Sequence, residues 1–275
     1  MSEDAASIPQ LLHVRPGSSV KLAERDPAST PGFAGDKAAG RQRLKELRKE
    51  LSDFQRRFWA ERSHGLLIVL QALDAGGKDG AIRKVFTAFN PQGTTVTNFG
   101  VPTEEELAHD YLWRVHARTP GKGRIGIFNR SHYEDVLVVR VRSLVPEEVW
   151  RPRYDQINAF EQLLADSGTV ILKFFLHLSR DEQAERFRKR LDNPDKRWKF
   201  SLGDLEVREQ WDAYQAAYEE ALSRCSTEAV PWFVVPADHK WYRDVALAEV
   251  VAATGRRLDP QYPPSDEDLS GVTID

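Results

Sequence analysis

The stretch Leu66–Gly80, LLIVLQALDAGGKDG, joins an apolar run to a glycine-rich loop that contains a lysine. Such a sequence predicts a buried strand that enters a phosphate-binding loop at the start of a helix. On the P-loop pattern G-x-x-x-x-G-K-[ST], Gly77 and Lys78 match, whereas Ala72 replaces the first glycine and Asp79 replaces the hydroxyl residue. The stretch is therefore a degenerate P-loop, and it predicts phosphoryl transfer.

The backbone of this loop supplies most of the predicted phosphate binding. Amide groups at a helix N-terminus stabilise anions, and glycines permit positive φ and close approach of the backbone to a ligand. Lys78 adds a mobile positive charge, so we predict that it is catalytic. The remaining predicted phosphate contacts come from Ala75, Gly76, Gly77, Asp79 and Gly80.

The hydroxyl residue that the loop lacks ordinarily holds Mg²⁺, so another oxygen ligand is needed. Asp74 and Asp79 are carboxylates of the loop, and hard dications prefer such ligands. We favour Asp74 because it lies at the C-terminal end of the predicted strand. On the loop alone, an ordinary strand-to-helix turn without a ligand stays open as the alternative.

Composition indicates one globular α/β domain, because the chain has 275 residues of which 41% are hydrophobic and 29% charged. The apolar run over 65–73 is too short to span a bilayer, and the N-terminus MSEDAASIPQ lacks the regions of a signal peptide. We therefore expect a cytoplasmic protein with no membrane partner. The single cysteine, Cys225, excludes an internal disulfide and a cysteine-based metal cluster.

Charge is clustered although the net charge is only −3. Residues 186–199 hold seven Lys or Arg against two Asp, and residues 41–62 hold eight basic and four acidic residues. The C-terminal sequence SDEDLSGVTID is acidic. A polyanion would therefore be bound by a local cluster and not by the charge of the whole chain.

Predicted strands and helices alternate beyond a loop-rich extension. The extension, residues 1–40, is rich in Pro, Gly and Ser and is expected to wrap the surface or fray. Residues 41–260 form the predicted phosphotransferase domain, and residues 261–275 form an acidic tail. The predicted strands cover 66–73, 94–99, 125–128, 169–176 and 230–235.

The helices predicted between these strands complete the fold class. They cover 41–62, 80–89 and 103–115, and a further helix follows the Ser179 cap. Alternating strands and helices predict a central parallel five-stranded sheet with helices on both faces, the three-layer α/β sandwich of a P-loop kinase with a helical lid. The apolar face of residues 44–58 is either core or a contact between subunits.

Residues that follow the predicted strands carry the remaining site chemistry, because ligands of open α/β sheets bind at the carboxyl ends of the strands. Asn129, Arg130, Glu134 and Asp135 follow the third strand and offer oxygen ligands for a metal and a guanidinium for phosphate. A salt-bridged helix start is the alternative for this group. His132 is predicted to be structural, since no second histidine stands at ligand spacing.

The basic segment over 186–199 follows the fourth strand, where a P-loop kinase carries its lid. Arg186 and Arg190 share one helical face, and Arg197 and Lys199 lie beyond the Asn193–Pro194 break. This arrangement predicts a lid, at about 180–208, that closes over a string of phosphates. A merely solvated basic helix is the alternative.

Four blocks of the chain resemble the polyphosphate kinase 2 family of P-loop phosphotransferases. They are LDAGGKDG, FNRSHYEDVLVVRV, RFRKRLDNPDKRWKFS and VPADHKWYR. The resemblance implies Mg²⁺-dependent transfer of phosphate between inorganic polyphosphate and adenine nucleotides, with Mn²⁺ as an alternative metal and guanine as an alternative base. It also implies a homodimer or homotetramer.

The resemblance assigns roles residue by residue. Asp74 and Lys78 match the Walker A pair, Asp135 matches the Walker B carboxylate, and Arg190 matches the catalytic lid arginine. Asp74 and Asp135 are then the implied metal ligands. The diphosphate-accepting group usually shows FDRSWYNR, whereas FNRSHYED here is similar to the group that accepts both AMP and ADP.

Two other functions remain as alternatives. An ATP-dependent nucleotide or small-molecule kinase would share the P-loop but would need no polymer channel. A non-catalytic protein that binds nucleic acid through the basic runs is expected to have aromatic residues interleaved with the basic ones and a basic overall charge. Only Trp198 and Phe200 interleave and the net charge is −3, so we expect no nucleic-acid partner.

Overall fold

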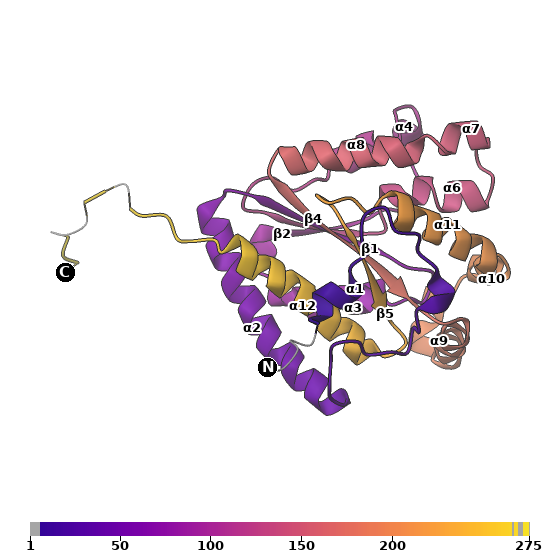
Figure 1. Cartoon of the computed structure of the whole chain (residues 1–275), viewed down its shortest axis with the longest axis horizontal. Helices are drawn as coiled ribbons and strands as arrows, with labels where there is room; N and C mark the ends of the chain where they lie inside the picture. The colour runs from indigo at the N-terminus through magenta and orange to yellow at the C-terminus, as the bar shows by residue number, and fades with distance from the viewer. Residues whose placement is uncertain (1–5, 266, 269–271, 275) are drawn as a thin grey trace.

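The computed structural model describes residues 6–265, 267–268 and 272–274, and a five-stranded parallel sheet forms its centre (Figure 1). The strand order is β2-β3-β1-β4-β5. The strands are β1 (Gly65–Gln71), β2 (Thr94–Asn98), β3 (Ile125–Asn129), β4 (Thr169–His177) and β5 (Trp232–Pro236). The predicted α/β fold class, with its five parallel strands, is confirmed.

Strand β1 lies in the middle of the sheet because both of its faces are apolar. It pairs with β3 on one side and with β4 on the other, and every residue of the strand is buried. A continuous apolar run is what a strand needs when helices cover both faces. The loop that follows β1 is therefore fixed at the centre of the carboxyl edge.

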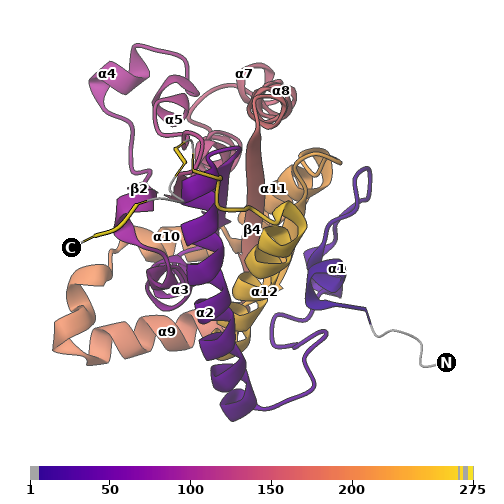
Figure 2. The same cartoon turned by 90° about the vertical axis from the view of Figure 1, so that its left-hand side faces the viewer.

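One face of the sheet is covered by α2 and α12, which lie side by side (Figures 1 and 2). Gly255 of α12 packs against the ring of Phe54 in α2, where a Cβ would leave little room. Shorter helices complete this layer. The helices of this face are α1 (Ile8–Leu12), α2 (Lys37–Glu61), α3 (Lys78–Val85) and α12 (Lys240–Leu258).

The apolar face of α2 belongs to the core. Leu47, Leu51, Phe54 and Phe58 are at most 2% exposed and pack in the same cluster as α12 and β1. This settles the open choice between core and subunit contact in favour of core, and the homodimer or homotetramer stays a prediction. The helix begins at Lys37, earlier than predicted, because the Asp36 side chain accepts hydrogen bonds from two amides of the first turn.

The opposite face of the sheet is covered by α8 and α11 together with several short helices. Their buried side chains form a second apolar cluster with β1, β3 and β4. The elements of this layer are α4 (Glu104–Leu107), α5 (Trp113–His116), α6 (Val138–Val141), α7 (Glu147–Trp150), α8 (Arg153–Asp166) and α11 (Trp211–Arg224).

The single helix predicted over 103–115 is wrong. The Thr103–Glu106 capping box is present and opens α4, but α4 ends at Leu107, and α5 begins only at Trp113. Between them, the Asp110 carboxylate accepts a hydrogen bond from the Leu112 amide. Such a local side-chain bond competes with helix continuation, and the sequence pattern of apolar residues did not reveal it.

Short 3₁₀ turns close several loops. The helix predicted over 80–89 stops at Val85 and continues as one of these turns, η2. The turns are η1 (Leu22–Glu24), η2 (Phe86–Ala88), η3 (Pro91–Gly93), η4 (His132–Asp135) and η5 (Pro194–Lys199). The described residues of the acidic tail over 261–275 carry no helix or strand, and the others lie outside the described residues.

The N-terminal extension packs along the surface over its described length, which is the first of the two alternatives left open by the sequence. The Val14 amide donates to the Trp232 carbonyl, 2.8 Å away, so the extension runs beside β5. Ile8, Leu12 and Leu22 are buried. Among the described residues, no helix combines the length and the apolarity needed to cross a membrane.

The predicted lid segment stands beyond the carboxyl edge of the sheet. It contains α9 (Arg180–Asp192), η5 and α10 (Gly203–Glu209). Helix α9 starts close behind β4, and the Ser179 hydroxyl accepts a hydrogen bond from the Glu182 amide at its first turn. The lid is therefore anchored next to the loop that follows β1.

Candidate active site

The loop between β1 and α3 has the backbone geometry of an anion-binding turn. Ala75 and Gly77 have positive φ values of 62° and 101°. For alanine this conformation is uncommon and costs about 1 kcal/mol or more, so neighbouring groups must hold it. Lys78 is the first residue of α3, and the preceding amides therefore lie at a helix N-terminus.

Two buried arginines lie against this loop. Arg186 Nη1 donates to the carbonyls of Ala75 and Gly76 at 2.9 and 3.2 Å, and its Nη2 donates to Ala237 at 2.6 Å. A Cβ at Gly77 would collide with the guanidinium of Arg243, so this position requires glycine. Arg186 fixes the carbonyls of Ala75 and Gly76, which leaves the loop amides for a ligand, while Arg243 packs against Gly77 and donates to Asp244.

A cavity of about 500 Å³ opens on the amide side of the loop. It brings together residues that follow β1 and β3, which were predicted to meet because ligands bind at the carboxyl ends of the strands, and adds residues of the predicted lid segment. Its predicted lining residues are Asp74, Ala75, Gly76, Gly77, Lys78, Asp79, Gly80, Asn129, Arg130, Arg190 and Lys199. Most of the residues predicted from separate sequence blocks thus line one cavity.

Three cations of the cavity are each paired with a carboxylate of the cavity. Arg130 Nη2 lies 3.0 Å from Asp74 Oδ1. The lid contributes the other two pairs, Arg190 with Asp204 at 3.6 Å and Lys199 with Asp79 at 3.7 Å. Such partly exposed pairs are weak, so a phosphate chain can compete for the same cations.

Lys78 lies deeper than these pairs. Its Nζ donates to the Ala72 carbonyl at 2.8 Å, and only 9% of the residue is exposed. Burial, followed by the nearby charge of Arg130, lowers the pKa of Lys78. An incoming phosphate would favour the charged form of this ammonium group.

A second cavity, of about 400 Å³, adjoins the first and shares Asp74, Arg130 and Asp204 with it. Its walls are more apolar, and they are formed by the loop after β1, by η4, α6 and α11, and by the predicted lid segment. The remaining lining residues are Ala72, Leu73, Val101, Glu134, Leu137, Val138, Arg142, Ser201, Gly203, Val207, Tyr214 and Tyr218. A flat apolar group bearing phosphate fits this combination of apolar wall and arginines.

The two carboxylates of η4 have different surroundings. Glu134 lines the second cavity and accepts a hydrogen bond from Gln71 at 3.1 Å. Asp135 lies outside both cavities, where Arg153 Nη1 donates to its Oδ1 at 2.9 Å. Burial raises the pKa of Asp135, and the charge of Arg153 partly offsets this effect.

Two predicted phosphate-binding residues do not line either cavity. Arg186 is the buried group behind the loop, and Arg197 donates to the Leu191 carbonyl within the lid. Trp198, an aromatic residue within the basic segment, is 77% exposed and lines the first cavity. Helical spacing alone did not distinguish an arginine aimed at the loop backbone from one aimed at phosphate.

Several lining residues were missed. Asn98 ends β2 and Phe99 and Gly100 follow it, so applying to this strand the rule that ligands bind at the carboxyl ends of strands would have found them. Asn98 accepts a hydrogen bond from Asn129, which also donates to Asp79. Asp204 gave no sequence signal, because it enters the cavity only through the fold of the lid.

A divalent metal fits this site when substrate phosphates supply some of its ligands. Among the described residues, no group of three or more His, Cys, Asp or Glu is arranged to hold a metal ion. Mg²⁺, however, is commonly bound by one or two carboxylates together with substrate phosphates. Asp74 lines both cavities and meets that requirement, while His132 is buried against Glu161 as a structural residue.

Comparison with known proteins agrees with this geometry. The family model described as polyphosphate kinase 2 (PPK2) matches residues 34–261. An AMP/ADP-polyphosphate phosphotransferase from Meiothermus ruber is 53% identical over 262 residues, which cover 95% of this chain and 98% of that protein. An ADP-polyphosphate phosphotransferase from Rhodopseudomonas palustris is 45% identical over 249 residues, 86% of each chain. The crystal structure of polyphosphate kinase 2 from Arthrobacter aurescens TC1 superposes with a TM-score of 0.93 at 42% identity, covering 97% of this chain and 95% of that one.

Proposed function

Because the chain belongs to the polyphosphate kinase 2 family, we propose that it transfers phosphate between inorganic polyphosphate and AMP or ADP. The observation that carries this proposal is the cavity at the P-loop, in which cations from the loop, β3 and the lid face one another. A chain of phosphates is an anion long enough to contact all of them at once. The products are ADP and ATP, and the transfer is reversible in principle.

Different residues are proposed to position the donor phosphates, the junction of the two cavities and the polyphosphate chain. The loop amides and Lys78 hold the donor phosphates, and Arg130 lies where the two cavities meet. We propose the segment 180–208 as a lid whose Arg190 and Lys199 exchange their carboxylate partners for phosphate oxygens when polyphosphate enters. Catalysis then consists mainly of alignment and charge stabilisation.

The metal is proposed to be Mg²⁺, with Mn²⁺ as an alternative. Asp74 is the carboxylate that faces the cavities, and Asp135 is the second predicted ligand. When bound, the metal neutralises charge that develops on the phosphoryl oxygens. Arg153 engages Oδ1 of Asp135, and the other carboxylate oxygen is the one proposed for the metal.

The acceptor nucleotide is proposed to occupy the second cavity. Its apolar wall, which includes Leu137 and Val138, suits a nucleobase, and Arg130 and Arg142 suit the phosphate of the nucleotide. The FNRSHYED block and the similarity to the Meiothermus ruber protein support acceptance of both AMP and ADP. Adenine is the proposed base, with guanine as the alternative.

The test is an assay with purified protein, Mg²⁺ and long-chain polyphosphate, with AMP or ADP as the acceptor. We expect ATP from both acceptors, because one cavity serves both nucleotides. ATP from ADP alone would move the protein to the diphosphate-accepting group. No product from polyphosphate, but transfer from ATP to AMP, would favour the ATP-dependent kinase instead.

Two parallel measurements complete this test. GMP and GDP in place of the adenine nucleotides measure base selectivity. Filter binding of polyphosphate against single-stranded DNA separates the enzyme from a nucleic-acid-binding protein, because the latter would prefer the DNA.

Substitution of Arg190 tests the proposed lid. Its guanidinium lines the first cavity 3.6 Å from Asp204, so Arg190→Ala should weaken polyphosphate binding. We expect the KM for polyphosphate to rise about tenfold or more, because one charged contact of about 1.5–3 kcal/mol is lost. The matched control is Arg188→Ala, since Arg188 lies on the same helix with its side chain 69% exposed. An unchanged KM for polyphosphate and an unchanged turnover in Arg190→Ala would contradict the proposal that the segment 180–208 acts as a lid over polyphosphate.

A further inference from the structure

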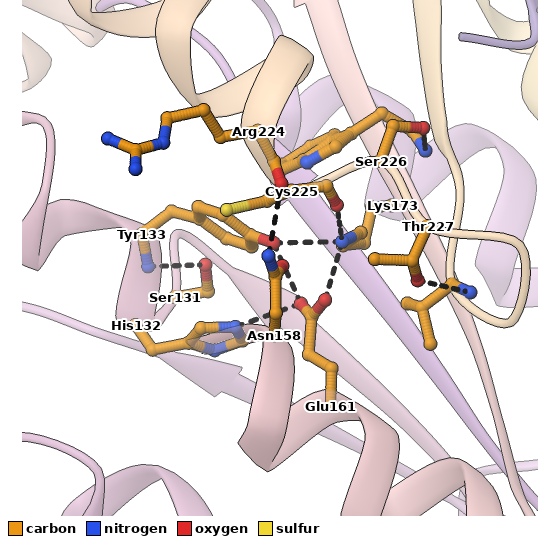
Figure 3. A network of polar contacts seen from close by, with 12 residues as sticks. Ser131, His132, Tyr133, Asn158, Glu161, Lys173, Arg224, Cys225, Ser226 and Thr227 are labelled. Atoms are coloured by element: carbon orange, nitrogen blue, oxygen red, sulfur yellow. Dashed lines mark hydrogen bonds and ion pairs between the residues drawn. The ribbon is translucent and has the colours of Figure 1, made fainter. Parts of the chain in front are cut away.

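A fully buried group of charged and polar side chains lies behind the site loop that follows β3 (Figure 3). Its centre is the ammonium group of Lys173, in the middle of β4, with no exposed surface. Lys173 shares one face of β4 with Ile171 and Phe175, which pack in the apolar cluster of that layer. A lysine at such a position is rare unless it is paired.

All three donors of the Lys173 ammonium are used. Its Nζ donates to Tyr133 Oη at 2.8 Å, to Glu161 Oε2 at 2.5 Å and to the Cys225 carbonyl at 2.6 Å. These partners come from η4, α8 and the end of α11. One side chain therefore ties together three segments that are distant in sequence.

Glu161 extends this group toward η4. Its Oε1 accepts a hydrogen bond from Tyr133 Oη at 2.9 Å and lies 3.1 Å from His132 Nε2. The Tyr133 hydroxyl thus accepts from Lys173 and donates to Glu161, which closes a triangle (Figure 3). Two consecutive residues of η4, His132 and Tyr133, are therefore held by polar contacts on the buried side of the turn.

The residues that flank His132 and Tyr133 in sequence line the cavities instead. Arg130 lines both cavities and has a positive φ of 63°, and Glu134 lines the second cavity. Helix α8 also reaches the end of the turn, because its Arg153 binds the Asp135 carboxylate. The site loop is thus held by α8 at two points and by β4 at one.

A gain in stability is weak grounds for such an arrangement. Replacing a buried ion pair by apolar side chains of similar volume is often neutral or stabilising, because the pair must be stripped of water. A fully satisfied polar network does, however, impose one geometry on the segments that it joins. The segment that it joins here carries Arg130, Glu134 and Asp135.

We propose that Lys173, Glu161 and Tyr133 are positioning residues for phosphoryl transfer. They hold η4 from its buried side so that Arg130 and Glu134 meet Asp74 at the junction of the two cavities. None of the three touches substrate, and all act through the placement of the loop. The kinetic part of this inference rests on the proposed function.

The sharpest variant is Tyr133→Phe, which removes one hydroxyl and no charge. Its matched control is Tyr242→Phe, because Tyr242 is equally buried and its hydroxyl donates to the Pro31 carbonyl on the opposite face of the sheet. Tyr133→Phe loses two hydrogen bonds to charged groups, whereas Tyr242→Phe loses one to a carbonyl, so Tyr133→Phe should be the less stable of the two and activity is compared per folded molecule. Only Tyr133→Phe should release the site loop.

We expect kcat of Tyr133→Phe to fall about tenfold or more per folded molecule, since a small misplacement of aligned groups is costly. The KM for polyphosphate, set mainly by the P-loop and the lid, should change less than about twofold. Kinetics of Tyr242→Phe should match the wild type. Equal kinetic constants in Tyr133→Phe and Tyr242→Phe would overturn the proposal.

Hydrogen exchange gives a readout that does not depend on activity. The amides of Val136 and Leu137 donate to the Tyr133 carbonyl, and they should exchange about tenfold faster in Tyr133→Phe than in Tyr242→Phe. Equal exchange would overturn the positioning role. If the wild-type chain formed no nucleotide product, the proposed function would fail, whereas this comparison would still test the placement of the loop.

A double-mutant cycle identifies the group through which the network acts. Tyr133→Phe made in an Arg130→Ala background should lower kcat further by less than about twofold, because the misplaced side chain is already gone. A full and independent loss in that background would show that the network does not act through Arg130. It would overturn that part of the proposal.

Discussion

Replacing Lys78 by alanine is expected to remove nearly all phosphate transfer while the protein remains folded. Lys78 lines the first cavity at the start of α3 and is the deepest cation there. Losing one such contact in the transition state should cost about 2–4 kcal/mol, or about 30- to 1,000-fold in kcat. The measurement is ATP formation from polyphosphate and ADP under saturating substrates.

The matched control for this variant is Lys84→Ala on the same helix. Lys84 is exposed in the last turn of α3 and lines neither cavity. It should keep wild-type kcat, and circular dichroism should show both variants folded. Full activity of a folded Lys78→Ala would contradict the assignment of the loop as the donor site.

The fold could be predicted from local patterns because each strand carries its own signal. The apolar run of β1 matches a strand buried on both faces, and the β-branched residues of β2 match a strand near the edge. The capping box at Thr103 predicted the start of α4 correctly. The end of α4 was missed because it depends on a local side-chain bond of Asp110 and not on periodicity.

The part of the site that could be predicted is the part explained by one rule, that ligands of open α/β sheets bind at the carboxyl ends of the strands. That rule placed Asp74, Asn129 and Arg130 in one cavity, since parallel strands end at a common edge. It gives no information on side-chain direction beyond the strand ends. Whether Arg186 aims at phosphate or at the loop carbonyls depends on contacts across more than 100 residues of sequence, where no local pattern exists.

Replacing Asp135 by asparagine is expected to lower kcat about 10²–10³-fold and to raise the Mg²⁺ concentration needed for half-maximal rate. The reason is that the variant removes a carboxylate predicted to be a metal ligand while it keeps the shape of the side chain. In the structure this carboxylate lies 2.9 Å from Arg153 and outside both cavities. The same loss would therefore also follow if Asp135 served only to anchor η4 to α8.

Arg153→Met separates these two explanations, because it breaks the same pair and leaves the carboxylate in place. If Asp135 contributes its charge to the metal, Arg153→Met should keep its Mg²⁺ dependence, and kcat should fall no more than about tenfold from loosening of η4. If Asp135 is only an anchor, Arg153→Met should reproduce the whole loss seen in Asp135→Asn, with no change in Mg²⁺ dependence in either variant. The second outcome would leave Asp74 as the carboxylate on which metal binding depends, since of the two only Asp74 lines the cavities.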